Sequence, residues 1–226
     1  MRVLGSNEAL VDFVAGRAPS YLGGERRDKR TLAAMRLVDR AAFLPPEQRW
    51  AAYADESAPI GHGQTCSQPS MVAFMLDKLS IHPGMKLLEV GAGCGYAAAL
   101  LAVLCAPGGR VTALEIQGEL ARLARTNCAV LAGSLGWASA ASIEVLEADG
   151  SAGLPNSGPF DRVLLSAGAS RKRFDEDPLL AQLTEGGILL YPEERGRLFR
   201  IERKGHFYLR ESWEGVAFVP LTGKNA

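Results

Sequence analysis

Long apolar segments and an excess of charge of one sign are both missing from this 226-residue chain. No run of about 18 apolar residues is present to span a bilayer, so we expect no contact with a membrane. The 25 Lys and Arg residues balance the 25 Asp and Glu residues, which gives no general attraction to nucleic acid. The first residues also lack the features of a secretory signal, so the expected location is cytoplasmic.

Cysteine and histidine are scarce, with four and three residues respectively. The cysteines form no C-x-x-C pair and no histidine cluster accompanies them, so we expect no metal site. They do not suggest a disulfide framework either, and we expect free thiols in a reducing compartment. The four cysteines are Cys66, Cys94, Cys105 and Cys128.

Hydrophobic residues make up 47% of the chain, enough for the core of a single domain over residues 1–226. Residues 1–60 have helical patterning and are expected to form an N-terminal helical extension packed on that domain. Ser6 is the expected cap of a first helix, and a second is expected over residues 32–43, stopped by two prolines. The charged tract at 25–30 is expected to be a solvated helix start.

Residues 69–192 alternate apolar strand patterns with helical patterns, which predicts an α/β fold. Strands are predicted at 86–90, 110–115, 143–147, 160–166 and 187–191, and helices at 69–79, 95–106, 117–131 and 178–184. The expected architecture is a Rossmann-like, mostly parallel sheet with helices on both faces. A loop is predicted at 133–142. Short strands at 198–203, 207–211 and 216–221, with a hairpin turn at 204–206, predict an antiparallel C-terminal edge.

The first predicted strand of this sheet leads into a glycine-rich loop that follows the acidic Glu89. Gly91, Gly93 and Gly95 permit positive φ and let a ligand approach the backbone, and the next helix points its N-terminus at the same place. The dinucleotide pattern G-x-G-x-x-G is not matched, because Tyr96 stands where its third glycine belongs. An acid before G-x-G-x-G instead resembles the first motif of class I methyltransferases, whose cofactor is S-adenosylmethionine. Alone, such a loop also occurs as a tight turn without a ligand.

Acidic residues also end the next two strands. Glu115 is placed where a carboxylate can accept hydrogen bonds from ribose hydroxyls. Asp149 and Gly150 follow the third strand, where an acid can bind the adenine amino group. Taken alone, Glu115 is also explained as an acid at a helix N-terminus, and Asp149-Gly150 as an ordinary turn. Together with the glycine loop, the three features predict a site for S-adenosylmethionine.

A loop rich in glycine and small polar residues, at 58–69, precedes this core. Pro69 is placed to open a helix, with Ser67 or Gln68 as its cap. Two glycines and two hydroxyls exceed what a cap needs, and they suit a site for a peptide backbone and a carboxylate. His62 in this loop is either a contact to the acceptor or a structural histidine.

The signature of the protein-L-isoaspartate O-methyltransferase family, roughly P-I-G-x-G-Q-T-x-S-Q-P, is closely matched by this loop. It reads Pro59-Ile60-Gly61-His62-Gly63-Gln64-Thr65-Cys66-Ser67-Gln68-Pro69. The resemblance continues in order at 87–96, 159–162, 182–187 and 216–221, and covers about residues 31–222. It implies methyl transfer from S-adenosylmethionine to the α-carboxyl of L-isoaspartyl residues, a repair reaction on damaged proteins and peptides. The expected enzyme is a monomer.

The resemblance also assigns residues to roles. Ser67 matches the family's active-site serine and is the expected catalytic residue, with Gln64, Thr65 and His62 as expected substrate-binding residues. The expected cofactor-binding residues are Glu89, Gly91, Gly93, Gly95, Glu115, Asp149 and Gly150.

The chain departs from the family pattern at several positions on the acceptor side. His62 stands where tyrosine is usual, and Ser151 where tryptophan follows Asp149-Gly150. The T-A-A-A-P segment is replaced at 166–170 and is followed by the basic run 171–173, and charged residues replace a proline-glycine turn at 192–196. These changes bear on acceptor choice more than on methyl transfer.

An acceptor carboxylate is already ionised at pH 7, since its reference pKa is about 4, so no general base is needed. We expect Ser67 to orient it for in-line transfer in a water-poor pocket. The alternatives are a methyltransferase of the same fold acting on another carboxylate or small molecule, and a module that binds without transfer. A nucleic-acid methyltransferase is disfavoured, because an N/D-P-P-Y/F type of motif is missing after the fourth strand.

Overall fold

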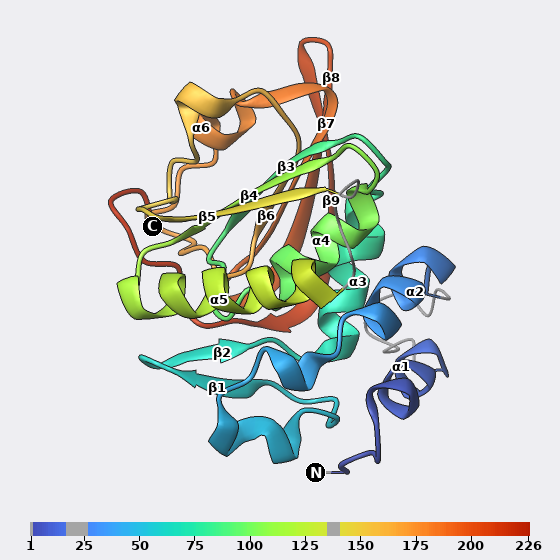
Figure 1. Ribbon diagram of the computed structural model, residues 1–226. Helices are drawn as coiled ribbons and strands as arrows, with labels where there is room; N and C mark the ends of the chain where they lie inside the picture. Colours follow the sequence, from blue (N-terminus) through green and yellow to red (C-terminus); the bar gives the residue numbers. More distant parts are fainter. Residues whose placement is uncertain (1, 17–26, 135–140) are drawn as a thin grey trace.

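The centre of the molecule is a seven-stranded sheet in the order β5-β4-β3-β6-β7-β8-β9 (Figure 1). The computed structural model describes residues 2–16, 27–134 and 141–226. The strands are β3 (Lys86–Val90), β4 (Arg110–Glu115), β5 (Ser142–Glu147), β6 (Phe160–Leu165), β7 (Leu183–Pro192), β8 (Arg195–Lys204) and β9 (Phe207–Ala217). Strands β3 to β7 run parallel, whereas β8 and β9 are antiparallel. The predicted mostly parallel sheet with an antiparallel C-terminal edge is confirmed.

Successive residues of a strand point to opposite faces of the sheet, and apolar residues are buried on both faces. Leu87 belongs to a core cluster that includes residues of the three helices α3, α4 and α5, and the neighbouring Leu88 belongs to a second cluster that includes Leu179 and Leu180 of α6. These helices are α3 (Pro69–Leu79), α4 (Tyr96–Cys105), α5 (Gly118–Ser134) and α6 (Asp177–Leu180). The helix predictions for 69–79, 95–106 and 117–131 are confirmed within a few residues.

The strand order changes direction between β3 and β6, which places a crevice at the carboxyl ends of these two strands. Ser166 follows β6 and donates its backbone N–H to Val90 at the end of β3, at 2.8 Å. Gly91 in turn donates to the carbonyl of Leu114 in β4, at 2.8 Å. The ends of β4, β3 and β6 are thereby held side by side beneath the crevice.

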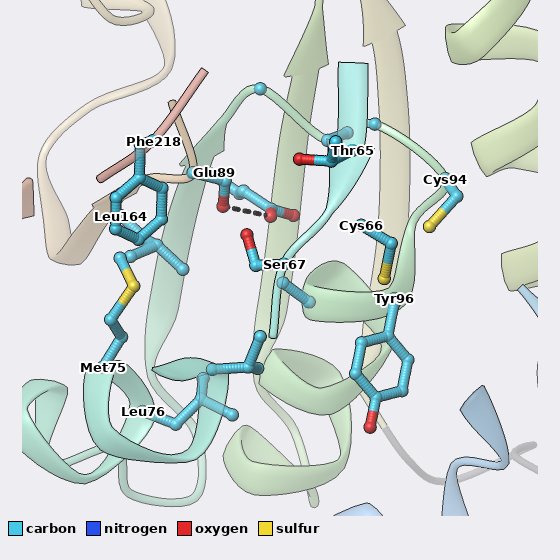
Figure 2. A pocket seen from close by; sticks show the side chains of 16 residues that line it. Thr65, Cys66, Ser67, Met75, Leu76, Glu89, Cys94, Tyr96, Leu164 and Phe218 are labelled. Atoms are coloured by element: carbon cyan, nitrogen blue, oxygen red, sulfur yellow. Dashed lines mark hydrogen bonds between the residues drawn. The ribbon is translucent and has the colours of Figure 1, made fainter. Parts of the chain in front are cut away.

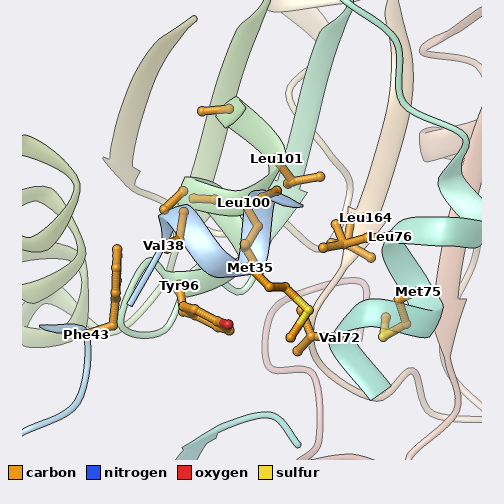
Figure 3. Packing of buried hydrophobic residues seen from close by; sticks show 14 of the residues in the cluster. Met35, Val38, Phe43, Val72, Met75, Leu76, Tyr96, Leu100, Leu101 and Leu164 are labelled. Atoms are coloured by element: carbon orange, nitrogen blue, oxygen red, sulfur yellow. The ribbon is translucent and has the colours of Figure 1, made fainter. Parts of the chain in front are cut away.

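Among the described residues before position 58, the N-terminal region contains the helices α1 (Asn7–Gly16) and α2 (Lys29–Leu37) and the 3-10 turns Arg40–Ala42 and Pro46–Ala51. The expected cap of α1 is present, with the Ala9 N–H donating to Ser6 Oγ at 3.2 Å. Figure 3 shows Met35 and Val38 beside Leu100 of α4, all three in the first core cluster. The N-terminal region therefore shares the core of the sheet.

The second helix is shorter than predicted, because α2 ends at Leu37 instead of continuing through Phe43. The Asp39 carboxylate accepts the N–H of Ala41 at 2.9 Å and so starts a separate 3-10 turn. The expectation of a solvated tract at 25–30 is wrong for Arg27, which is 6% exposed and forms an ion pair with Asp77. Glu25 and Arg26 lie outside the described residues.

Three further predictions are corrected in the C-terminal half. The helix expected at 178–184 is only the short α6, because the Gln182 side chain bonds the backbone of Leu154 and Ala152 and β7 begins at the next residue. The strand expected at 207–211 continues as β9 through Ala217 and pairs with β8 to its end, whereas residues 218–221 of the strand expected at 216–221 lie beyond β9 and form only an isolated bridge at Pro220. Of the loop expected at 133–142, residues 133 and 134 belong to α5, residue 142 opens β5, and 135–140 lie outside the described residues.

Candidate functional site

The segment that carries the family signature is an antiparallel hairpin of β1 (Ala58–Gly61) and β2 (Gln64–Cys66), followed by the start of α3. Neither Ser67 nor Gln68 caps α3 with its side chain. Gln68 is the N-cap residue and Pro69 opens the helix, as predicted. The capping hydrogen bond comes from Asp55, whose Oδ1 accepts the N–H of Ser70 at 2.8 Å and whose Oδ2 accepts the Gln68 amide at 3.0 Å. The Ser67 hydroxyl is directed into a cavity (Figure 2).

A buried arginine holds this segment from beneath. Arg40 has a relative exposure of 0%, and its guanidinium donates to the backbone carbonyls of Cys66 and Ser67, each at 3.3 Å. It also donates to the carbonyls of Ala52 and Glu56 at 2.9 and 3.0 Å. The only signal for this role in the sequence was a cation within an apolar helical pattern.

The glycine loop between β3 and α4 adopts positive φ at its three glycines, +88° at Gly91, +56° at Gly93 and +87° at Gly95. Gly91 and Gly93 both line two neighbouring cavities, so bare backbone faces the space a ligand would take. Gly95 has a different neighbour, because a Cβ there would lie 3.2 Å from the backbone of Ala124 in α5. Its small size serves the packing of α5 against the loop.

Glu115 joins this loop to the end of β4. Its Oε2 accepts the N–H of Gly93 at 2.8 Å, and its Oε1 accepts the N–H of Gln117 at 3.0 Å. Each carboxylate oxygen retains a lone pair for a further donor. Glu115 lines the second cavity together with Gln64 and Gly150. The structure thus brings the predicted ribose-binding acid to the glycine loop.

Glu89 is completely buried at the floor of the first cavity. Its Oε1 accepts the Ser166 hydroxyl at 2.7 Å (Figure 2), whereas Oε2 is buried with no hydrogen-bond partner among the described residues. Burial raises the pKa of this carboxyl to about 8, and the nearby Glu115 and Cys66 add to the rise while Ser166 opposes it. A buried carboxylate oxygen without a partner fits a cationic ligand group.

The third acid has a different partner. Asp149 Oδ2 accepts the N–H of Lys224 at 2.9 Å, and Ser151 accepts the N–H of Asn225 through Oγ at 3.0 Å, so the C-terminal segment covers this position. Burial raises the pKa of Asp149, but the hydrogen bonds from Lys224 and Ser151 outweigh it and lower that pKa. Gly150 lines the second cavity, whereas Asp149 is not among its lining residues.

Three hollows meet at the β2 segment. The first cavity, about 50 Å³, lies between Ser67 and Glu89, and the second, about 40 Å³, lies over Glu115. The third is an open groove of about 420 Å³, lined by Ser67, Gln68, Met71, Glu194, Arg195 and Phe218 among others. Thr65 lines all three hollows, and Ser67 lines the first cavity and the groove. These two residues form the boundary between the glycine-loop cavities and the groove.

His62 lies apart from this group. It occupies the tip of the hairpin at φ +53°, and its Nε2 lies 2.7 Å from the Glu119 carboxylate in the first turn of α5. It does not line the three hollows. The basic run at 171–173 also has a local partner, since Arg171 forms an ion pair with Glu193 at 2.8 Å.

Among residues 2–16, 27–134 and 141–226, no group of three or more His, Cys, Asp or Glu side chains is arranged to hold a metal ion. Within the same ranges no helix combines the length and the apolar character needed to cross a bilayer.

Comparison with known proteins gives consistent results at the level of sequence and structure. Residues 22–226 match the family model described as protein-L-isoaspartate(D-aspartate) O-methyltransferase. A protein-L-isoaspartate O-methyltransferase from Methanoregula boonei is 43% identical over 202 residues, covering 88% of this chain and 87% of the relative. One from Roseiflexus is 41% identical over 221 residues, covering 96% and 92%. A crystal structure described as a Plasmodium falciparum enzyme of the same type, in complex with S-adenosyl-L-homocysteine, has a TM-score of 0.78 at 24% identity and covers 97% of this chain and 99% of its own.

Proposed function

The chain belongs to the protein-L-isoaspartate(D-aspartate) O-methyltransferase family, and from this premise we propose that the boundary formed by Thr65 and Ser67 is where methyl transfer takes place. The activity is transfer of a methyl group from S-adenosylmethionine to the α-carboxyl of L-isoaspartyl residues in damaged proteins. Isoaspartyl-containing proteins and peptides are its substrates. One observation carries the proposal: Thr65 lines both glycine-loop cavities and the open groove.

The residues around the two cavities fit the cofactor. When bound, S-adenosylmethionine supplies an electrophilic methyl group on a sulfonium. The unpartnered Glu89 Oε2 is suited to its ammonium group, and the Glu115 carboxylate to its ribose hydroxyls. Gly91 and Gly93 provide the backbone surface for close approach. Asp149 accepts the N–H of Lys224 through Oδ2 and retains a lone pair there for the adenine amino group.

The groove on the other side of the boundary is the proposed acceptor site. Ser67 Oγ is directed toward the glycine-loop cavity, where its hydroxyl can donate to an acceptor carboxylate and hold it in line with the methyl carbon. The carboxylate is ionised at neutral pH, so no side chain has to remove a proton. Arg40 keeps the Ser67 backbone in place through the carbonyl bonds described above.

Two charged residues, Glu194 and Arg195, line the groove. They stand where the family pattern has a proline-glycine turn. This rim supports one alternative, a methyltransferase of the same fold that prefers another carboxylate or a small molecule. We further propose that residues 1–226 form a single domain, with 1–60 as its N-terminal extension. A monomer in the cytoplasm is proposed as well, and the four free thiols support such a reducing compartment.

A pair of peptides that differ only in an aspartyl or isoaspartyl linkage tests the function. With methyl-labelled S-adenosylmethionine, we expect label in the isoaspartyl peptide alone and S-adenosylhomocysteine in equal amount. Equal labelling of both peptides would contradict repair specificity. Binding of cofactor and peptide without S-adenosylhomocysteine formation would identify a binding module instead of an enzyme.

A further inference from the structure

Two of the four cysteines lie side by side at the junction of the two functional loops. Cys66 ends β2 directly before Ser67, and Cys94 lies between Gly93 and Gly95. Both sulfurs border the first cavity, and Figure 2 shows the two side chains near one another. Both thiols are buried, with relative exposures of 5% for Cys66 and 2% for Cys94. A disulfide bond between them would link the segment that carries Ser67 to the glycine loop.

The surroundings make Cys66 the more reactive thiol of the pair. The hydrogen bond from Cys94 and the Arg40 guanidinium lower the pKa of Cys66 to about 6, against the opposing effect of burial. The same hydrogen bond, together with burial, raises the pKa of Cys94. Burial raises the pKa of Cys105 and of Cys128 to about 12, so these thiols remain protonated. The thiolate is the form that reacts with oxidants.

We propose that Cys66 and Cys94 form a reversible disulfide when the protein meets a hydroperoxide, and that this bond inactivates the site. The Cys66 thiolate attacks one oxygen of hydrogen peroxide, the O–O bond breaks and a sulfenic acid forms, and the hydroxide that leaves takes a proton from solvent to become water. The Cys94 sulfur then attacks the sulfenic sulfur, the S–S bond forms, and the hydroxyl leaves as water with the Cys94 proton. The peroxide gains the two electrons that the two thiols lose.

Closing the bond requires movement at the boundary of the site. The two sulfurs must approach to about 2.05 Å. Arg40 holds the backbone of Cys66, and Asn127 and Glu115 bind the backbone of the glycine loop at Cys94 and Gly93, so closing the bond strains these contacts. The glycine loop is therefore drawn toward β2, and the cavity between Glu89 and Ser67 narrows. This consequence rests on the proposed function, because it assumes that the first cavity holds part of the cofactor.

Peroxide treatment followed by catalase, alkylation and peptide mass spectrometry tests the bond itself. We expect a linked peptide pair containing Cys66 and Cys94, with Cys105 and Cys128 alkylated. Saturation with S-adenosylhomocysteine before treatment should slow linkage by at least about tenfold, because the ligand occupies the cavity that both thiols border. Absence of the linked peptides in the unliganded protein would overturn the proposal.

Binding and activity are measured on the same samples. The oxidised protein should lose affinity for S-adenosylhomocysteine by at least about tenfold, and dithiothreitol should restore it. Cys94→Ala should show no dithiothreitol-reversible loss, while the matched variant Cys105→Ala should behave as the unmodified chain. Cys66→Ala gives the same test if Cys94→Ala does not fold. Linkage without loss of binding would overturn the inactivation, whereas linkage with loss of binding in a protein inactive on isoaspartyl peptide would refute only the proposed function.

Discussion

The backbone N–H of Gly93 donates a 2.8 Å hydrogen bond to the Glu115 carboxylate, which joins the glycine loop to the end of the neighbouring strand β4. Two motifs that the sequence presents separately are thus parts of one structure. Glu115 also fixes the start of the following segment through the N–H of Gln117. The acid that is proposed to bind the ribose therefore also shapes the loop beside it.

Replacing Glu115 with alanine should weaken cofactor binding and also lower stability. Two backbone amides lose their acceptor and the ribose hydroxyls lose theirs, and a hydrogen bond to a charged group contributes about 1.5–3 kcal/mol. We expect the Kd of S-adenosylhomocysteine to rise by about 10- to 100-fold in calorimetry, with a lower Tm. The control is Glu144→Ala, an exposed acid on β5. An unchanged Kd in Glu115→Ala would refute the assignment.

Alanine substitutions at Gly95 and Gly84 distinguish the stability cost of backbone strain from the cost of close packing. Both have positive φ, +87° and +82°, but a Cβ at Gly95 would meet Ala124 and Cys128, whereas one at Gly84 would meet nothing within 4 Å. We expect Gly84→Ala to cost about 1–2 kcal/mol from strain alone. Gly95→Ala should cost about 1–3 kcal/mol more through overpacking. Urea unfolding of the two variants measures the difference, and equal costs would show that Gly95 has no packing role.

Glu89 should make stability depend on pH. Burial raises its folded pKa from 4.5 to about 8, so the folded protein binds a proton that the unfolded chain releases over this interval. The stabilisation of the folded state by this bound proton is full below about pH 4.5 and is lost as the pH rises to about 8. It amounts to about 1.4 kcal/mol for each unit of the pKa difference.

Glu89→Gln cannot ionise, so its Tm should fall less than that of the unmodified chain between about pH 5 and about pH 8. The exposed Glu144→Gln serves as the matched variant. Parallel Tm profiles for Glu89→Gln and the unmodified chain would mean that Glu89 is already ionised in the folded protein. Calorimetry at the same pH values should show weaker S-adenosylhomocysteine binding to Glu89→Gln, because the ammonium loses its carboxylate.

The parallel core was predictable from the sequence because its strands are short apolar runs with glycine or acids at their ends. The strands predicted at 86–90 and 110–115 have the observed bounds, β3 and β4. The glycine loop and Glu115 also lie together as the pattern implied. These local patterns predict the elements correctly because each element buries its own apolar residues against the sheet.

The remaining features depend on contacts between distant segments. Arg40 binds the carbonyl of Ser67, and Lys224 binds Asp149, across 27 and 75 residues of chain. The hydrophobic periodicity of neither segment indicates these distant partners. The helix expected to reach Phe43 ended early for a local reason instead, because the Asp39 side chain competes for the backbone.

The central claim is that Ser67 orients the acceptor while the cofactor lies on the other side of the Thr65 boundary. Ser166 is the matched residue for a contrast, since it lines both glycine-loop cavities but not the groove, and its hydroxyl binds Glu89. The measurement is the single-turnover methylation rate at saturating cofactor, together with the Kd of S-adenosylhomocysteine, for Ser67→Ala and Ser166→Ala.

For Ser67→Ala the predicted result is a transfer rate lower by about 10- to 100-fold with the Kd unchanged, from loss of one hydrogen bond to a carboxylate. Ser166→Ala should instead raise the Kd by about tenfold or more, because Glu89 loses its partner. A Ser67→Ala protein that loses cofactor affinity but transfers methyl groups at the normal rate once saturated would contradict the account.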